Sequence, residues 1–434
     1  MDENIRRDVD RRLSNMIGDE GIKVPGLGAI VYRDGAEVYD GFWGNRVLAA
    51  DGQNLPMTRE ARFRVASVSK MFVAFTLLQL AEEGRLCLDD DASLYLGFTL
   101  RNPHFSHIPI TVGMLANHTS SLRDGKIYSI PPEKSVREFF CPTGEYWENG
   151  AHFGGADQPP GVYFTYSNLN YGLLGTIIEA VTGERFDRYQ KDHILRQLDT
   201  GADYVPGNFS RREFEKLGAI YQKKDGLGHW DEFGEWYGKA DDYRGIRPPS
   251  EMIALQNPYD ENARELCSLK NYRPGNNATA FSPTGGLRIS AEELSHALEM
   301  LLNDGTYRGR QILSPASVAL MLGCQWAYDP QQKNGATYGG TLLSYGLGAY
   351  RMPGGSTAGL CRNPRIDLVG HTGEAFGLFS ALCLRPGRKD GFIYIVNGTA
   401  IDLETDGRSR GQIGNNYIWE EMLADALCRF FGEN

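Results

Sequence analysis

The stretch Ser67-Val68-Ser69-Lys70 opens a mostly apolar run at residues 68–83, and that run predicts a helix buried on nearly all sides that ends near Gly84. Ser67 and Lys70 are three residues apart, so on a helix they share one face. Backbone N–H groups are free at a first helical turn, and an apolar setting lowers the pKa of a lysine. The pair therefore suggests a serine nucleophile activated by Lys70. On the tetrapeptide alone, a capping serine beside a snorkelling lysine is the more ordinary interpretation.

A second group of polar residues is Tyr166-Ser167-Asn168. The phenolate of a tyrosine beside a cationic lysine is favoured, which makes Tyr166 a candidate base. Asn168 can donate to a substrate carbonyl and accept a hydrogen bond from Lys70. Taken by itself, the segment also suits a turn before a helix.

The third group is His371-Thr372-Gly373, which follows a strand-like segment at residues 366–370. An imidazole, a hydroxyl and a glycine at a strand edge suit a substrate that docks along the strand, and Gly373 would let its backbone come close. A lone histidine near a strand is usually structural. The occurrence of all three groups in this order favours the catalytic interpretation of each.

Together the three motifs resemble the signature motifs of the penicillin-recognising serine hydrolases. That superfamily includes class C β-lactamases, low-molecular-weight D-alanyl-D-alanine carboxypeptidases, D-aminopeptidases and family VIII esterases. The stretches 115–122 and 282–287 are similar to the family as well, and the likeness covers about residues 24 to 400. The motifs are specific for the superfamily and do not separate its activities.

The resemblance implies a role for each residue of the first two motifs. Ser67 would be acylated, and Asn168 would hold the substrate amide. Lys70 and Tyr166 would share the proton transfers. Each of these residue types can perform the chemistry that its position would require.

The third motif would complete the site on the substrate's other side. His371 would replace the lysine of class C β-lactamases, and Thr372 and Gly373 would line the bound substrate. The resemblance implies an oxyanion hole made by the backbone N–H groups of Ser67 and Glu374. Each such donor stabilises a tetrahedral intermediate by roughly 2.7–4 kcal/mol.

Two positions depart from the family pattern. Ser121 stands where the family usually has glycine, and Glu374 stands where the family mostly has a small residue. A carboxylate beside the oxyanion hole would repel an anionic end of a substrate, unless the Glu374 side chain turns to solvent.

Strand signals gather at both ends of the chain. A hairpin is expected over 27–47, and short strands are expected between 344 and 397. Helices are expected at 170–182 and 186–198, and residues 225–245 look like an irregular insertion.

We expect an α/β (α+β) fold. An antiparallel sheet from both chain ends would be flanked by helices, with a mostly helical lobe inserted, as in the β-lactamase/transpeptidase fold that the resemblance implies. Residues 1–434 would form one catalytic unit. The sheet lobe would take about 1–85 and 281–434, and the helical lobe about 86–280, with an insertion at 200–280.

Composition limits the partners and the compartment. The formal net charge of −10 argues against nucleic acid. No segment reads as a membrane span, and the first residues lack the apolar stretch of a secretory signal. The seven scattered cysteines suggest reduced thiols packed as small apolar residues in a cytoplasmic protein. A periplasmic or secreted location would apply if a signal peptide had been removed.

The sequence therefore predicts a serine hydrolase without metal or cofactor. It would act through a Ser67 acyl-enzyme on amide or peptide bonds of the D-alanyl peptide or D-amino-acid amide type. Its partners would be small molecules or short peptides, with β-lactams as further acylating or hydrolysed compounds. The alternatives are an esterase, an acyltransferase or cyclase of the same family, or a non-catalytic penicillin-binding sensor.

Overall fold

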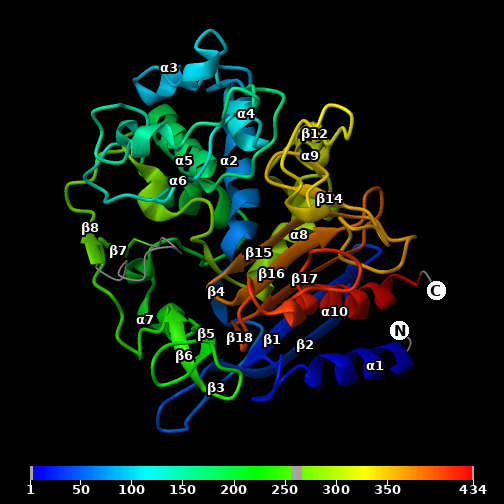
Figure 1. The fold of residues 1–434 in the computed structure, drawn as a ribbon. Coiled ribbons are helices and arrows are strands. Elements are labelled where there is room, and N and C mark those ends of the chain that lie inside the picture. The colour runs from blue at the N-terminus through cyan, green and yellow to red at the C-terminus, as the bar shows by residue number, and fades with distance from the viewer. Residues whose placement is uncertain (1–2, 256–265, 433–434) are drawn as a thin grey trace.

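A computed structural model describes residues 3–255 and 266–432 of the chain. Among these residues, nine strands form one antiparallel sheet in the order β12-β13-β14-β15-β16-β17-β1-β2-β3 (Figure 1). The strands are β1 (Gly26–Arg33), β2 (Ala36–Val47), β3 (Leu55–Pro56), β12 (Trp326–Ala327), β13 (Ser344–Tyr345), β14 (Tyr350–Met352), β15 (Leu368–Ala375), β16 (Leu378–Leu384) and β17 (Gly391–Val396).

The centre of this sheet joins the two ends of the chain. β1 pairs with β17 from Leu27 opposite Val396 to Tyr32 opposite Gly391. On its other side, β1 forms a hairpin with β2 through Asp34 and Gly35, whose φ angles are 52° and 80°. Positive φ at both central residues is what tight hairpins require, and Asp-Gly supplies it. The expected fold class, an antiparallel sheet built from both chain ends and flanked by helices, is confirmed.

Helices cover both faces of the sheet because the inner strands are apolar on both sides. Leu27 and Val31 of β1 belong to a buried cluster with residues of α1 (Glu3–Ser14) and α10 (Ile418–Leu427). Ile30 points the other way, into the cluster that contains α2 (Ser69–Glu82) and α8 (Ala291–Leu302). Figure 1 shows α1 and α10 side by side on one face and α2 on the other.

The helical part lies mostly between residues 86 and 200. The two helices expected there are α5 (Asn168–Thr182) and α6 (Phe186–Gln190), and a π-helical turn, Lys191–Leu195, extends α6. The remaining α-helices and short strands described outside residues 200–280 are α3 (Ser93–Leu96), α4 (Val112–Ala116), α9 (Pro315–Leu322), β4 (Arg62–Arg64), β9 (Arg288–Ser290), β10 (Thr306–Tyr307), β11 (Arg310–Gln311) and β18 (Gly398–Thr399).

The expectation of an irregular segment at 225–245 is wrong for residues 235–240. Those residues form β6 (Glu235–Ala240), which pairs with β5 (Ile220–Lys224), and β18 adds to β5 in parallel. The ammonium groups of Lys223 and Lys224 lie 5.3 and 3.8 Å from the ring centroids of Trp236 and Trp230. These cation–π contacts stabilise a pairing that has little apolar alternation to reveal it.

The rest of the predicted insertion at 200–280 contains a short helix and a second small hairpin. These are α7 (Arg211–Phe214), β7 (Met252–Ala254) and β8 (Leu266–Ser268). Residues 256–265 of the insertion lie outside the described residues.

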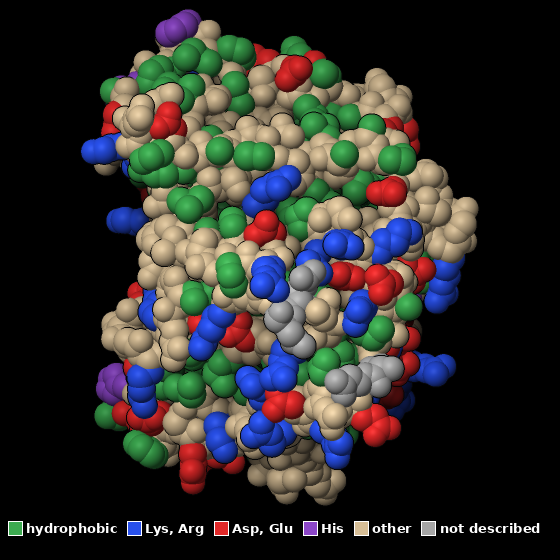
Figure 2. Space-filling model, turned by 90° about the vertical axis from the view of Figure 1, so that its right-hand side faces the viewer, with side chains coloured by type: hydrophobic (Ala, Val, Ile, Leu, Met, Phe, Trp, Pro, Cys, Tyr) green, Lys and Arg blue, Asp and Glu red, His purple; other side chains and the backbone are tan. Residues whose placement is uncertain are grey.

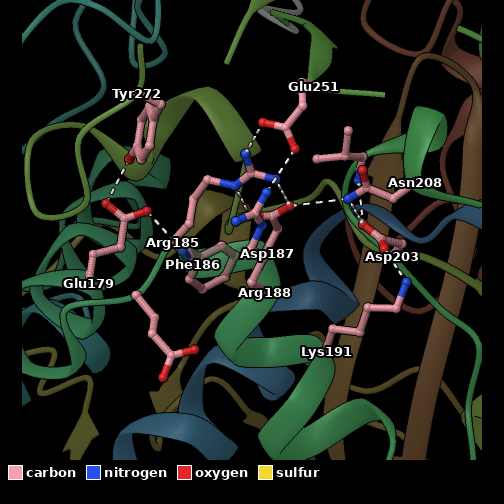
Figure 3. A network of polar contacts seen from close by, with 12 residues as sticks. Glu179, Arg185, Phe186, Asp187, Arg188, Lys191, Asp203, Asn208, Glu251 and Tyr272 are labelled. Atoms are coloured by element: carbon pink, nitrogen blue, oxygen red, sulfur yellow. Dashed lines mark hydrogen bonds and ion pairs between the residues drawn. The ribbon is translucent and has the colours of Figure 1, made fainter. Parts of the chain in front are cut away.

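Ion pairs attach the start of the β7–β8 hairpin to α6 (Figure 3). Arg185 donates to Asp187 and to Glu251, both at 2.7 Å, and Arg188 donates to Glu251 at 2.9 Å. Arg185 and Asp187 are buried, so this is a paired charge cluster and not a loose surface contact.

The surface carries both signs of charge. Figure 2 shows the side of the molecule on which both chain ends lie in Figure 1, and basic and acidic side chains are interspersed there. On α1, Asp8 pairs with Arg11 and Arg12 and also with Arg429 near the C-terminus. In the described parts of the chain, no helix has the length and apolar character that crossing a membrane requires.

The cysteines differ from the expectation that they pack as apolar residues. All seven are free thiols, but of these only Cys361, Cys383 and Cys428 are buried. Cys87 and Cys324 are exposed. Scattered cysteines in a sequence therefore do not by themselves identify core positions.

Candidate active site

Ser67 lies at a sharp turn between a strand and a helix. The chain leaves β4, passes through Ala66 with a left-handed φ of 46°, and forms a 3-10 turn over Ala66–Val68 before α2 begins. A positive φ is costly for alanine, so surrounding contacts must hold it. The Val65 N–H donates to the Leu287 carbonyl at 3.0 Å, and the Ser380 hydroxyl donates to the Val65 carbonyl at 2.8 Å.

Gly373 brings β15 against this turn. A Cβ atom at Gly373 would lie 2.5 Å from the Val65 carbonyl oxygen and 3.1 Å from the Ala66 Cβ, which is too close for any other residue. The sequence predicted that Gly373 admits a substrate backbone. In the structure, Gly373 instead lets β15 approach the turn at Val65 and Ala66, which carries Ser67.

Lys70 connects the first two motifs. Its Nζ donates to Ser67 Oγ and Asn168 Oδ1 at 2.9 Å each, and to the Thr284 carbonyl at 3.0 Å. The side chain is fully buried, and this burial lowers the pKa of Lys70 to about 7, against the opposing charge of Asp124. A substantial fraction of Lys70 is therefore an uncharged amine near neutral pH. In that form Nζ donates only two of these bonds, and its lone pair can accept the proton of the Ser67 hydroxyl.

Tyr166 donates from its hydroxyl to Ser67 Oγ at 2.8 Å. Burial raises the pKa of Tyr166 above its usual value, so the side chain is a neutral phenol. The expectation of a favoured phenolate is therefore wrong for the free protein. Lys70 is close, with Nζ 4.8 Å from the Tyr166 ring centroid, but burial weakens the positive charge that would have favoured ionisation.

Asn168 begins α5 and is held from three sides. Its Oδ1 accepts from Lys70 and from the Thr284 hydroxyl, and its Nδ2 donates to Asp124 at 2.9 Å. Asp124 and Thr284 were not predicted. Both lie in or next to family-like stretches, and their spacing from the motifs gave no signal that they reach Asn168.

His371 lies beside Tyr166, with the ring centroids 6.1 Å apart. Its Nδ1 bonds to the Thr372 carbonyl, so its Nε2 accepts from the Tyr345 hydroxyl at 3.0 Å. Burial and the nearby Lys70 lower the pKa of His371 to about 3. The ring is therefore uncharged, and both of its nitrogens already have partners within the protein.

Thr372 and Glu374 lie on either side of Gly373 in β15. The Thr372 hydroxyl exchanges a hydrogen bond with Tyr350 at 2.9 Å. Glu374 is exposed, but the surrounding protein desolvates its carboxyl group, and Glu420 lies near. Both effects raise the pKa of Glu374 to about 7, and the Gly377 N–H opposes them.

The edge of β15 beside these residues is open. β14 pairs with β15 only from Leu368 to Gly370, so among the described strands none covers the edge from His371 to Ala375. An edge without a partner strand can present backbone N–H and C=O groups to a ligand, although the Thr372 carbonyl here already bonds to His371 Nδ1. Within the described residues, no three His, Cys, Asp or Glu side chains gather as a metal site would require.

Comparison with known proteins agrees with this arrangement. A family model described as Beta-lactamase matches residues 9–412. Protein flp of Staphylococcus aureus (strain MRSA252) is 26% identical over 217 residues, which are 49% of this chain and 41% of that protein. The matched segment therefore spans less than half of that protein's length.

Two solved structures share the fold. A D-amino acid amidase from Ochrobactrum anthropi SV3 aligns with a TM-score of 0.64 at 19% identity, covering 99% of this chain and all of that one. An octameric penicillin-binding protein homologue from Pyrococcus abyssi aligns with a TM-score of 0.61 at 22% identity, covering 100% of this chain and 78% of that one.

Proposed function

Because this chain belongs to the beta-lactamase family of serine hydrolases, we propose that it hydrolyses small amides or peptides of the D-amino-acid amide or D-alanyl type through an acyl-enzyme on Ser67. The observation that carries the proposal is the contact set around one oxygen. Ser67 Oγ accepts hydrogen bonds from Lys70 at 2.9 Å and from Tyr166 at 2.8 Å.

The proposed first step is attack by Ser67 Oγ on the substrate carbonyl carbon. Neutral Lys70 takes the Ser67 proton, and the carbonyl oxygen becomes an oxyanion held by the backbone N–H groups of Ser67 and Glu374. When the carbon–nitrogen bond breaks, Tyr166 gives its proton to the departing amine and regains one from Lys70. A water molecule then repeats the sequence on the ester and releases the acid.

The neutral state of Tyr166 changes its proposed part. A phenol that is not ionised cannot be the initial base, but it can pass a proton between Lys70 and the leaving group. Lys70 has a pKa of about 7, close to neutral pH, and is therefore better suited than Tyr166 to act as the general base.

The third motif favours an uncharged end on the substrate. A carboxylate is bound best by a cation or by free donors. His371 is uncharged and has both ring nitrogens engaged, and the Thr372 hydroxyl is shared with Tyr350. Glu374 adds a carboxyl group at the same edge. We therefore propose amides, or substrates with a free amino group, ahead of D-alanyl peptides with a free carboxylate. The fold shared with a D-amino acid amidase supports this choice.

Labelling with a fluorophosphonate tests the mechanism. We expect one adduct, at Ser67, by peptide mass spectrometry, and none in Ser67→Ala. An adduct at another serine, with turnover retained in Ser67→Ala, would overturn the proposal.

Paired substrates test the specificity. We expect a D-alanyl-D-alanine C-terminal amide to have a higher kcat/KM than the free acid. Glu374→Gln should narrow that ratio, because like charges close together cost about 1–4 kcal/mol depending on the local dielectric. The matched control is Glu184→Gln, an exposed acid on a distant loop. An unchanged ratio in Glu374→Gln would show that Glu374 does not set the preference, and a wild-type preference for the free acid would restore the carboxypeptidase alternative.

A further inference from the structure

We propose that Asp124 is a positioning residue of this active site, whose carboxylate fixes the Asn168 side-chain amide in the orientation that the Ser67–Lys70 pair requires. The inference rests on the proposed function, because it assigns Asp124 a part in the same reaction. Asp124 lies just beyond the family-like stretch 115–122, and no motif of the sequence analysis includes it.

The two carboxylate oxygens of Asp124 have separate partners. Oδ1 accepts from the Ser167 hydroxyl and from the Leu169 N–H, each at 2.9 Å, and so anchors the start of α5. Oδ2 accepts from Asn168 Nδ2 at 2.9 Å. The helix is held by one oxygen, and the other oxygen remains for Asn168.

This second contact decides which way the Asn168 amide faces. An amide has one acceptor end and one donor end, and a carboxylate can only accept. Asp124 therefore draws Nδ2 toward itself and leaves Oδ1 facing Lys70 Nζ at 2.9 Å. The reverse orientation would set the amide NH₂ against the amine of Lys70 and Oδ1 against a carboxylate. In the observed orientation, one Nδ2 hydrogen remains for a substrate carbonyl.

Asp124 also acts on Lys70 through this amide. The other titratable side chains that face Lys70 are Tyr166 and Tyr171, whose pKa values are raised, and His118 and His371, whose pKa values are lowered. All four are uncharged near neutral pH. Asp124 is the charge that raises the pKa of Lys70, against the larger effect of burial. Burial also raises the pKa of Asp124 itself, and the hydrogen bonds from Leu169, Ser167 and Asn168 oppose that effect.

The first test is Asp124→Asn in the full chain, measured as the rate of Ser67 labelling by a fluorophosphonate between pH 5 and pH 9. An asparagine at position 124 can donate to Asn168 Oδ1 and so permit the reversed amide. We expect the labelling rate on its plateau to fall about 10²-fold, as misplaced reacting groups do. The acid limb of the profile, where the rate rises with pH, should move to lower pH. Without the negative charge of Asp124, the pKa of Lys70 falls. Asp157→Asn, an exposed acid on a neighbouring loop, should match the wild type.

The second test exchanges the two groups, Asp124→Asn with Asn168→Asp. The exchange keeps one carboxylate and one amide in contact, so it remains informative if Asp124→Asn alone does not fold. It places the carboxylate beside Lys70, so the acid limb should move to higher pH than in the wild type. A purely structural role for Asp124 predicts that the folded single variant keeps the wild-type plateau rate, because only the orientation of the Asn168 amide links Asp124 to the reacting groups.

The outcomes are separable. If wild-type Ser67 is not labelled, the proposed function fails and this inference fails with it. If the wild type is labelled and folded Asp124→Asn shows the same rate and the same acid limb, only the positioning role of Asp124 is overturned.

Discussion

At the scale of single residues, the main feature is a lysine that is buried without a direct carboxylate partner. Lys70 has three acceptors, and all of them are neutral: a hydroxyl, an amide oxygen and a backbone carbonyl. A buried cation without a paired anion shifts toward its neutral form. The same burial that costs stability therefore prepares the base for proton transfer.

The pH profile of turnover should report this lysine. The pKa of Lys70 is lowered to about 7, so the base is protonated and inactive below that pH and free above it. We expect kcat/KM to rise with pH through an apparent pKa near 7 and then reach a plateau. A profile that rises only above pH 9 would show that Lys70 keeps its ordinary pKa.

Lys70 and Tyr166 should behave as one unit in a double-mutant cycle. Lys70→Ala and Tyr166→Phe should each lower kcat by roughly 10²–10⁴-fold. The double variant should lose much less than the product of the two, since both groups move the same protons. Steady-state kinetics on one amide substrate gives all four values, and strict multiplicativity would mean that the residues act independently.

The sequence was most informative about residues whose chemistry is visible in their type and spacing. Ser67 and Lys70 are three residues apart on a helix, so their contact could be predicted. The contact of Asp124 could not, because it depends on how a loop meets the start of α5, 44 residues further along the chain. The ionisation of Tyr166 was mispredicted because spacing gives proximity to Lys70 but does not give the degree of burial.

At the scale of elements, the helices were easier to predict than the strands of the inserted region. α2 and α5 carry continuous apolar faces and end at turn residues. β6 carries mostly polar and glycine residues, and its pairing with β5 depends on side chains across the pair. A pattern within one segment cannot show contacts that another segment provides.

The end of α5 is joined to the following segments by one buried carboxyl group (Figure 3). Glu179 accepts from the Phe186 N–H at 2.8 Å, the Tyr272 hydroxyl at 2.6 Å and the Gly275 N–H at 2.9 Å. Its side chain has no solvent exposure. It connects α5 to α6 and to residues 272–275, far along the chain.

Glu179→Ala should therefore destabilise the protein markedly. Three donors would lose their acceptor in a buried site, and we expect a loss of roughly 2–5 kcal/mol in the free energy of unfolding. Urea denaturation followed by circular dichroism measures it. The exposed neighbour Glu184→Ala is the matched control and should change stability by less than about 0.5 kcal/mol. Equal effects of the two substitutions would show that the Glu179 contacts contribute little.

At the scale of the whole molecule, the site depends on both ends of the chain. Ser67 follows β4 near the N-terminal end, whereas Gly373 comes from β15 near the C-terminal end. The two meet through Val65 and Ala66, and the sheet that carries β15 is joined to the N-terminal hairpin by β1 and β17. Loss of the β1–β17 pairing should therefore remove the site as well.

Ile30→Ala tests this dependence. Ile30 is fully buried in β1 opposite Ile393, so the substitution should cost about 2–5 kcal/mol. We expect Ser67 labelling and far-ultraviolet circular dichroism to be lost together along a urea series, in the variant as in the wild type, but at lower urea in the variant. Labelling lost well before the circular dichroism signal would show that the site opens separately from the sheet.

The assignment of strands from both chain ends to one sheet was predictable because strand signals gather at those ends. The order of the strands was not, since periodicity within a strand does not identify its neighbour. β1 and β17 are both apolar on both faces, so neither sequence by itself names the other as its partner.

The β1–β17 pairing also cannot form until most of the chain has been synthesised. A ribosome releases the β1–β2 hairpin early, but at about 5–20 residues per second its partner β17 follows on the order of a minute later. Throughout that interval the outer edge of β1 has no strand to pair with, and an unpaired apolar edge attracts other chains. We expect the nascent protein to need protection by a chaperone while it is being translated. We also expect it to gain the ability to acylate Ser67 only after nearly the whole chain has been made.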